Sequence, residues 1–409
     1  MARPDATTLR PGMYTQTRPG VRRAYTNDAM GAPPTEVPLA RVLGGLTREG
    51  DLHDHEAGGI RCHACGHRCF IPPGRAGVCR VRFNDGGTLR VPWGYVAGLQ
   101  CDPIEKKPFF HVLPGSEALS FGMLGCDLHC AYCQNWITSQ VLRDKEATAE
   151  ARLVEPREIV DIALERRAPV IASTYNEPLI TSEWAMAVMR EAVPRGILGA
   201  YISNGNATER VLDYIQPWVS LYKVDLKSFR DRSYRTLGGT LEAVLRTIAS
   251  VWRRGIWLEV VTLVVPGLND SDAEIADMAG FLHDLSPDIP WHLTAFHPDY
   301  RMTTTRATGA DALERAASIA RQHGMRFVYA GNRPGDVEDL ENTRCPSCRI
   351  LLVERTGFRV RRVAIDAAGK CPGCGLPVPG VWAGGVRHPA LPATPAGARA
   401  AAGAAPGQV

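Results

Sequence analysis

The stretch ALSFGMLGCDLHCAYCQN, residues 118–135, passes from an apolar run directly into three closely spaced cysteines. The apolar run is typical of a buried strand. The cysteines that follow, Cys126, Cys130 and Cys133, have the spacing C-x3-C-x2-C. Three thiolates leave a tetrahedral site one ligand short, and they can hold three irons of a four-iron cluster while the fourth iron stays open. The alternative is a zinc knuckle that borrows a distant fourth ligand.

The same pattern of apolar run and loop repeats through the middle of the chain. Seven runs predict strands at 118–124, 169–173, 199–203, 220–226, 257–265, 291–296 and 326–330. Amphipathic segments predict helices at 156–167, 182–193, 240–255 and 271–285, with helix starts marked by Pro156 and Ser271. This alternation predicts an α/β fold with a parallel sheet, and no GxGxxG motif follows the first strand. We therefore expect a partial, open TIM-like β/α barrel, with its chemistry just after the strands.

Composition and cysteine usage limit the class of protein. A net charge of +4 on 409 residues gives no reason to expect broad nucleic-acid or membrane binding. No apolar run could span a membrane, and the first 20 residues lack the apolar core of a secretory signal, so we expect a cytoplasmic protein. Eleven of the twelve cysteines fall into three groups, which in a reducing compartment indicates metal sites. Cys101 stands alone, and we expect it to be a buried, inert residue.

The C-terminal group has the spacing CxxC-x22-CxxC and consists of Cys345, Cys348, Cys371 and Cys374. Such knuckles bring four thiolates onto one ion, and short strands are predicted between them at 350–354 and 358–363. This pattern favours a zinc ribbon, with a rubredoxin-like single iron as the alternative.

The N-terminal group also has four thiols, Cys62, Cys65, Cys69 and Cys79. His63 and His67 lie among them and could replace a thiol. Either zinc or an auxiliary [4Fe–4S] cluster would suit this set, and the sequence leaves both open.

These patterns divide the chain into five parts. Both ends are rich in small residues and proline, which predicts disorder there. The expected parts are a disordered segment 1–37, an N-terminal cysteine-rich module 38–112, the barrel 113–335, a zinc-ribbon or rubredoxin-like module 340–382, and a disordered tail 386–409.

The three central cysteines, with Tyr132 before the last, resemble the motif of the radical S-adenosylmethionine (SAM) superfamily. The resemblance implies that Cys126, Cys130 and Cys133 hold a [4Fe–4S] cluster whose fourth iron binds SAM. It also implies that one electron from a reduced donor of the flavodoxin or ferredoxin type cleaves SAM. The product is a 5′-deoxyadenosyl radical, which abstracts a hydrogen atom from the substrate.

Segments after the later strands resemble other motifs of this superfamily. STYNEP (173–178) is similar to the G-G-E-P segment, SNGN (203–206) to T-N-G, KVDLK (223–227) to the D-x-K of pyruvate formate-lyase activating enzymes, and VPGLND (265–270) to V-P-G-x-N-D. Taken alone, these are also common as a helix-starting turn, a glycine turn and an ion pair on a strand. The resemblance implies that the residues around SAM are Tyr132, Asn176, Glu177, Ser203, Asn204, Asp225, Lys227 and His297.

The whole set of motifs, over about residues 60 to 382, resembles the radical SAM enzyme of the AmmeMemoRadiSam system, which is related to the activating enzymes of glycyl radical enzymes. That resemblance does not settle the substrate: hydrogen abstraction from a protein or peptide is the activating-enzyme version, and a small molecule or RNA is the alternative substrate. An activating enzyme needs an open active face, whereas an enzyme acting on a small molecule would close it, and the flanking cysteine modules would then serve as that lid.

A non-enzymatic zinc protein that binds nucleic acid is a remote alternative. It would use a basic strip near Phe358, made of Arg355, Arg359, Arg361 and Arg362. Because this alternative does not explain the three cysteines after the first strand, we do not expect a nucleic-acid partner.

Overall fold

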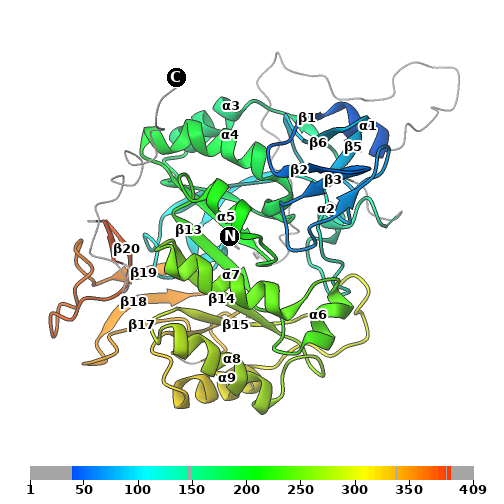
Figure 1. The fold of residues 1–409 in the computed structure, drawn as a ribbon. Coiled ribbons are helices and arrows are strands. Elements are labelled where there is room, and N and C mark those ends of the chain that lie inside the picture. The colour runs from blue at the N-terminus through cyan, green and yellow to red at the C-terminus, as the bar shows by residue number, and fades with distance from the viewer. Residues whose placement is uncertain (1–38, 145–148, 338, 384, 388–409) are drawn as a thin grey trace, which may run out of the picture. The chain divides into compact units, whose positions relative to one another are not determined.

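An eight-stranded sheet runs through the middle of the protein, with strand order β16-β15-β14-β13-β12-β11-β9-β8 (Figure 1). Its strands are β8 (Gly98–Pro103), β9 (Glu117–Gly122), β11 (Val170–Ser173), β12 (Leu198–Ser203), β13 (Leu221–Asp225), β14 (Trp257–Val264), β15 (Trp291–Ala295) and β16 (Val328–Gly331). The seven strands from β9 to β16 are parallel and coincide with the seven predicted runs. Strand β8 pairs antiparallel with β9 at the edge, and the sequence did not predict it.

The computed structural model describes residues 39–144, 149–337, 339–383 and 385–387. The predicted terminal segments, 1–37 and all but the first two residues of 386–409, lie outside this description. Within the described part, residues from Leu39 onward form one unit.

Helices connect the parallel strands, as the amphipathic segments predicted. The helices are α1 (Leu39–Gly45), α2 (Trp136–Ser139), α3 (Pro156–Glu165), α4 (Ser182–Ala192), α5 (Glu209–Ile215), α6 (Asp231–Leu237), α7 (Leu241–Arg253), α8 (Asp272–Leu285) and α9 (Ala310–Gln322). Short 3-10 turns are η1 (Ile104–Lys106), η2 (Pro178–Thr181) and η3 (Val193–Arg195). The predicted starts hold, because Ser271 caps α8 and Pro156 is the first residue of α3. Helices α1, α2, α5, α6 and α9 were not predicted.

The two faces of the sheet pack against different partners. Side chains alternate between faces along each strand, so neighbours such as Ala118 and Leu119 enter different cores. One core contains the apolar side chains of the helices. In the other core, residues near the start of several strands pack against the segment around Phe109 and Val112. This segment fills the sheet interior at the amino ends of the strands, which leaves the carboxyl ends for other side chains.

A buried carboxylate, Glu259 of β14, organises that interior. It accepts hydrogen bonds from the backbone N–H groups of Phe110 and His111, each at 2.9 Å. The Nε2 of His292 lies 2.7 Å from the Glu259 carboxylate. Burial raises the pKa of Glu259, but the hydrogen bond from the His292 ring and the other partners outweigh it, so that the pKa is lowered. Burial lowers the pKa of His111 to about 4. The network explains why an acidic residue can lie inside the sheet, because every acceptor is satisfied.

The N-terminal module is made of short antiparallel strands. Two three-stranded sheets, β1-β6-β5 and β2-β3-β4, and the pair β10-β7 form it. The strands are β1 (Thr47–Glu49), β2 (His53–Glu56), β3 (Gly59–Cys62), β4 (Phe70–Ile71), β5 (Phe83–Asp85), β6 (Thr88–Pro92), β7 (Tyr95–Val96) and β10 (Arg152–Leu153). Arg82 joins this module to α4 through two 2.7 Å hydrogen bonds to Glu183, and both side chains are buried.

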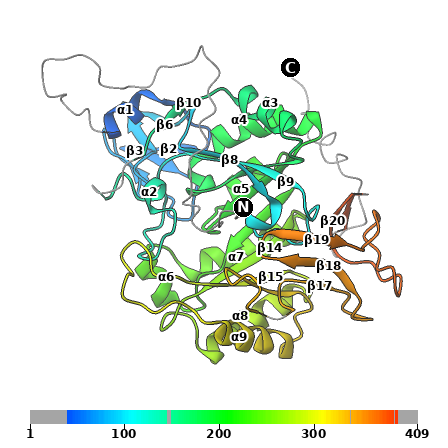
Figure 2. The same ribbon diagram turned by 180° about the vertical axis from the view of Figure 1, so that it is seen from behind.

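The C-terminal module packs against the amino ends of the central strands. Its strands are β17 (Thr343–Arg344), β18 (Leu351–Thr356), β19 (Arg359–Val363), β20 (Gly380–Trp382) and β21 (Gly385–Arg387). Cys345 and Leu352 share a core with Phe110, Phe327 and Tyr329, which lie at the amino ends of the central strands. Figures 1 and 2 show this orange module and the blue N-terminal strands on opposite sides of the sheet. The expected lid role is therefore wrong for the C-terminal module, because it lies at the other end of the strands.

Two further expectations are corrected by the packing. Arg355 does not belong to an exposed basic strip, because it is buried and donates to the Phe110 carbonyl at 2.6 Å. Cys101 is half-buried rather than buried, because its strand β8 forms the edge of the sheet. Burial, with Glu117 nearby, raises the pKa of the Cys101 thiol to about 11.

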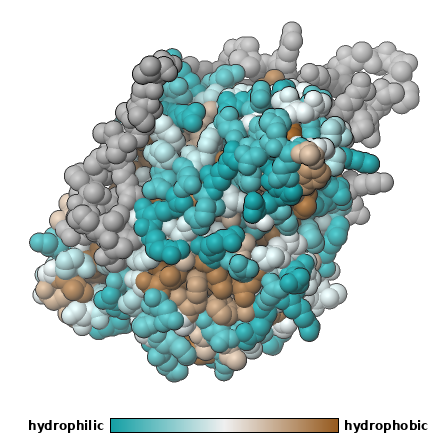
Figure 3. Space-filling model, in the orientation of Figure 1, coloured by the Kyte–Doolittle hydropathy of each residue, from teal (hydrophilic) through white to brown (hydrophobic). Residues whose placement is uncertain are grey.

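The surface seen in Figure 3 is largely hydrophilic, with hydrophobic residues gathered in the lower half of that face. None of the helices in the described ranges is long and apolar enough to cross a membrane.

The Arg82–Glu183 pair gives a test of how the N-terminal module is attached. Replacing Arg82 with Met leaves a buried carboxylate without its partner, which should lower the free energy of unfolding by about 3–5 kcal/mol. The midpoint of urea unfolding, followed by tryptophan fluorescence, measures this loss. As a control, Arg157→Met removes an exposed 3.8 Å pair with Asp161 and should cost less than about 1 kcal/mol. Equal losses in the two variants would contradict this reading of the attachment.

Candidate active site

The three central cysteines lie in the loop after β9, at the carboxyl edge of the parallel strands. Gly122 ends the strand, and a Cβ there would lie 2.4 Å from the carbonyl oxygen of Thr174. Gly125 has φ +91°, and a Cβ there would crowd Val81 at 2.9 Å. The two glycines thus let the chain turn sharply into the cysteine loop.

Asp127, between the first two cysteines, holds this loop to the next strand ends. Its buried carboxylate accepts 2.7 and 2.8 Å hydrogen bonds from the side-chain amides of Asn204 and Asn206. The backbone carbonyl of Asp127 lies 3.1 Å from the Nε2 of His67 in the N-terminal module. No signal in the sequence marks this role, because any residue fits the middle of a C-x3-C pattern.

Glu177, after β11, is tied to the loop after β12. Its carboxylate accepts from the Ser203 hydroxyl and the Asn204 N–H, both at 2.7 Å, and from the Leu179 N–H at 3.1 Å. Burial and the charge of Asp127 raise the pKa of Glu177 to about 8, despite these three donors. The predicted residues Glu177, Ser203 and Asn204 are therefore one connected group, with Asp127 as its unpredicted member.

The two residues before Glu177 shape the end of β11. Asn176 accepts from the Met123 N–H at 3.0 Å, which joins the ends of β9 and β11. Tyr175 has φ +69°, a left-handed conformation that costs a non-glycine residue energy. Its hydroxyl receives a 3.2 Å hydrogen bond from Lys107. Tyr175 stands where the G-G-E-P segment has a glycine, and its backbone keeps the conformation that glycine would adopt most readily.

Alternate side chains of β13 carry charge to the same edge. Asp225 pairs with Lys223 and, at 3.1 Å, with Lys227. Burial raises the pKa of Asp225, but the two lysine charges outweigh it and hold that pKa at about 2. Asn269, in the loop after β14, donates to the Lys227 carbonyl at 2.8 Å and fixes the backbone beside the pair.

The last two predicted residues lie in different surroundings. Tyr132 is buried with Cys130, Leu128 and Phe296. His297, after β15, is exposed, and its Nδ1 lies 3.3 Å from the carbonyl oxygen of Pro298. Among the described residues, no hydrogen bond connects His297 to the group around Glu177.

The donor set fits an iron–sulfur cluster with an open position. Cys126, Cys130 and Cys133 are buried or half-buried thiols, and the Leu128 N–H and the Ser139 hydroxyl lie within 3.4 and 3.2 Å of two of the sulfurs. Hydrogen bonds to thiolate sulfur stabilise such clusters. The polar side chains at the neighbouring strand ends supply groups that could hold a charged cofactor beside it.

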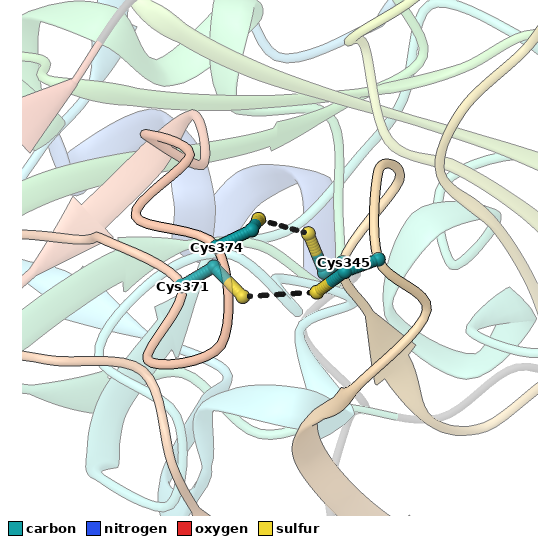
Figure 4. A group of neighbouring side chains, drawn as sticks. Cys345, Cys371 and Cys374 are labelled. Carbon is teal, nitrogen blue, oxygen red and sulfur yellow. Dashed lines mark hydrogen bonds between the residues drawn. The ribbon is translucent and has the colours of Figure 1, made fainter.

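The C-terminal thiols, by contrast, converge on one point. The sulfurs of Cys345 and Cys374 are 3.6 Å apart, as are those of Cys348 and Cys371 (Figure 4). All four lie within 4.8 Å of one another, and in the described ranges no other set of three or more His, Cys, Asp or Glu ligands is as tight. The arrangement can bind a metal ion, as the spacing predicted.

Comparison with known proteins identifies the class. The model of the Radical SAM superfamily matches residues 122–279. The chain is 36% identical over 319 residues to the uncharacterized protein MJ0808 of Methanocaldococcus jannaschii, which covers 77% of this chain and 94% of that protein. The protein belongs to the radical SAM superfamily and is an enzyme of that class, a family whose members use a [4Fe–4S] cluster and SAM.

Two activating enzymes are more distant relatives. The pyruvate formate-lyase 1-activating enzyme of Escherichia coli K12 is 22% identical over 232 residues, which are 53% of this chain and 93% of that enzyme. The isethionate sulfite-lyase activating enzyme of Oleidesulfovibrio alaskensis is 28% identical over 144 residues, 34% of this chain and 45% of that enzyme. These relatives confirm the predicted kinship with activating enzymes, while the AmmeMemoRadiSam subgroup stays a prediction.

Asp127 gives a test of how the cysteine loop is held. Asp127→Ala leaves two buried amides unpaired, which should cost about 1–3 kcal/mol for each amide. Urea unfolding of the metal-free protein measures the cost, and iron per chain after anaerobic reconstitution should fall. Asp161→Ala is the matched control, because this aspartate is exposed on α3 and should leave both quantities unchanged. Wild-type stability in Asp127→Ala would contradict the assigned role.

Proposed function

We propose that this enzyme reductively cleaves SAM at a [4Fe–4S] cluster bound by Cys126, Cys130 and Cys133. The observation that carries the proposal is the three-thiol loop at the carboxyl edge of the parallel strands, surrounded by polar side chains of the neighbouring strand ends. When bound, the cluster supplies one electron that converts SAM to methionine and a 5′-deoxyadenosyl radical. The protein's own part is to position SAM, exclude water and present the hydrogen donor.

The polar groups at the strand ends suit the charges of SAM. We assign Glu177, Ser203 and Asn204 to the amino end of the cofactor, because the Glu177 carboxylate is an acceptor that the Ser203 hydroxyl and the Asn204 N–H hold in place. Asp225 and Lys227 provide one charge of each sign for the carboxylate and ribose. Asn176 and Tyr132 support the residues that face the cofactor. Asn176 fixes the end of the strand, and Tyr132 packs on Cys130. His297 is exposed at the same edge, where it would reach the cofactor only from the solvent side.

For the substrate, we propose a protein or peptide from which the radical removes a hydrogen atom. The activating-enzyme relatives support this choice, because their names describe action on other enzymes. A small molecule or RNA is the second candidate. The same proposal includes membership of the AmmeMemoRadiSam subgroup, which rests on the motifs. It also includes a cytoplasmic setting and a flavodoxin- or ferredoxin-type reductant, which rest on the reducing chemistry that the cluster needs.

The described fold supports a curved, open barrel for this chemistry. Strands β8 and β16 are the two edges of the sheet, so the active edge is flanked by loops from all seven parallel strands.

We propose that the C-terminal module is a zinc ribbon. Four sulfurs around one zinc at 2.3 Å would be about 3.8 Å apart, close to the 3.6 Å of the two sulfur pairs.

The proposed chemistry is tested by an anaerobic assay with SAM and a one-electron reductant. The wild-type protein with a verified cluster should form 5′-deoxyadenosine and methionine, measured by liquid chromatography. Cys126→Ala, Cys130→Ala and Cys133→Ala should each reduce product to background, because each removes a cluster ligand. Cys101→Ala, outside all three groups, should retain wild-type activity. Absence of 5′-deoxyadenosine from the cluster-loaded wild type would refute the proposal.

The C-terminal metal is tested by elemental analysis. The double variant Cys371→Ser/Cys374→Ser should lose about one zinc ion per chain relative to the wild type. Cys101→Ser serves as the control and should keep it. If the double variant instead loses one iron, the module is rubredoxin-like and the zinc ribbon is wrong.

A further inference from the structure

The four N-terminal thiols form a second group that the proposed chemistry does not use. Cys62, Cys65 and Cys79 are buried, and Cys69 is half-buried. Pairing of β3 with β4 brings Cys62 opposite Cys69, where the Cys62 N–H donates to the Cys69 carbonyl at 2.9 Å. A Cβ on Gly77 would lie 3.4 Å from the Cys69 sulfur, so the turn before Cys79 approaches the same point. The fold thus gathers four thiols that lie up to 17 positions apart in sequence.

The spacing of these sulfurs differs from that of the C-terminal group. A single ion bound by four thiolates at 2.3 Å requires sulfurs about 3.8 Å apart, as the C-terminal group provides. In a four-iron cluster each thiolate binds a different iron, so the sulfurs are held farther apart. Within the described ranges, only the C-terminal set brings its ligand atoms together in this way, with all four sulfurs within 4.8 Å of one another. Neither the N-terminal thiols nor Cys126, Cys130 and Cys133 form so tight a set, which favours a cluster over a single ion at the N-terminal thiols.

The histidines of this module are engaged elsewhere. His63 Nε2 lies 2.7 Å from Asp54, and His67 Nε2 lies 3.1 Å from the carbonyl oxygen of Asp127. Replacement of a thiol by either ring, which the sequence left open, would give up these contacts. The ligand set that the fold favours is four cysteines.

The surroundings of the group are apolar and adjoin the catalytic loop. Cys65 and Cys79 pack with Val81, Ile180 and Leu142, and an apolar shell limits access of water to a cluster. The Cys79 carbonyl oxygen would lie 3.2 Å from a Cβ on Gly125, directly before the catalytic cysteines. The Gly66 N–H also donates to the Asn206 carbonyl at 2.7 Å. The N-terminal cysteine group and the catalytic loop therefore lie next to each other, in contact through the backbone near Cys79 and Gly125.

We infer that Cys62, Cys65, Cys69 and Cys79 bind an auxiliary [4Fe–4S] cluster, fully ligated by protein, beside the catalytic loop. The inference rests on the spacing, burial and position of these thiols and goes beyond the proposed cleavage of SAM. Because all four irons have cysteine ligands, this cluster has no open position for SAM.

The decisive experiment uses the full chain with Cys126→Ala, Cys130→Ala and Cys133→Ala combined. After anaerobic reconstitution with iron and sulfide, this triple variant should retain about four iron atoms and four sulfides per chain. It should also keep iron–sulfur absorption, and one-electron reduction should give a cluster signal in electron paramagnetic resonance. Since the variant cannot perform the proposed chemistry, its result is independent of whether the wild type cleaves SAM.

A second variant guards against loss of folding. Cys69→Ser changes only the half-buried ligand, and in the otherwise wild-type chain it should lower iron by up to four atoms per chain or alter the resonance spectrum. Cys101→Ser is the matched control and should do neither. The inference is overturned if the triple variant holds no iron, whether it then binds a second zinc ion or no metal at all. A wild-type spectrum and iron content in Cys69→Ser would exclude this cysteine as a ligand and overturn the four-cysteine site.

Discussion

The buried carboxylate of Asp127 is the interaction on which the active edge depends. It holds Asn204 and Asn206 through two short hydrogen bonds, while its backbone carbonyl contacts His67. Other contacts, such as the His129 N–H to the Leu237 carbonyl at 2.9 Å, hold the loop on its far side, and Asp127 ties it to the loop after β12. Burying a charge without partners is costly, so the acid is tolerated only when the loops around it are in place. The position of the cysteine loop is in this way coupled to the strand ends and to the N-terminal module.

The direction of the parallel strands separates two kinds of metal chemistry. The thiols of the catalytic loop and the N-terminal module lie at the carboxyl ends of the strands, beside Glu177 and the pair around Asp225. The C-terminal thiols lie at the amino ends, where Phe110 and Tyr329 share their core. A metal bound there would lie at the opposite end of the strands from the three-cysteine loop and would brace the amino ends of the sheet. The chain thus places cysteine groups at both ends of the parallel strands.

Much of this fold could be predicted because its signals are local. Seven buried strands show as apolar runs, and Ser271 and Pro156 mark helix starts through their own chemistry. Strand β8 could not be predicted, because its residues Gly98–Pro103 carry no apolar period and owe their pairing to β9. Helices shorter than two turns, such as α5 and α6, were likewise missed, since their stability comes from packing.

The site was predictable to the extent that its residues stand in motifs. The thiols and Glu177 could be found from spacing and resemblance. The role of Asp127 could not, because it arises only when loops about 77 residues apart in sequence meet. Arg355 looked like a surface charge for the same reason, since the partners that bury it, Phe110 and Glu105, are about 250 positions away in the chain.

Arg355 links the stability of the central sheet to that of the C-terminal module. It lies on β18 of the C-terminal module, yet it donates to the Phe110 carbonyl beside the central sheet and pairs with Glu105 at 3.6 Å. The two parts therefore share a core, and unfolding of either would expose apolar side chains of the other. Any ion that binds only the folded cysteine knuckles stabilises the whole protein by mass action, by about 2.7 kcal/mol when its free concentration is 100 times the dissociation constant. If the proposed zinc ribbon is correct, the supply of zinc would thereby influence how much of the folded enzyme is present.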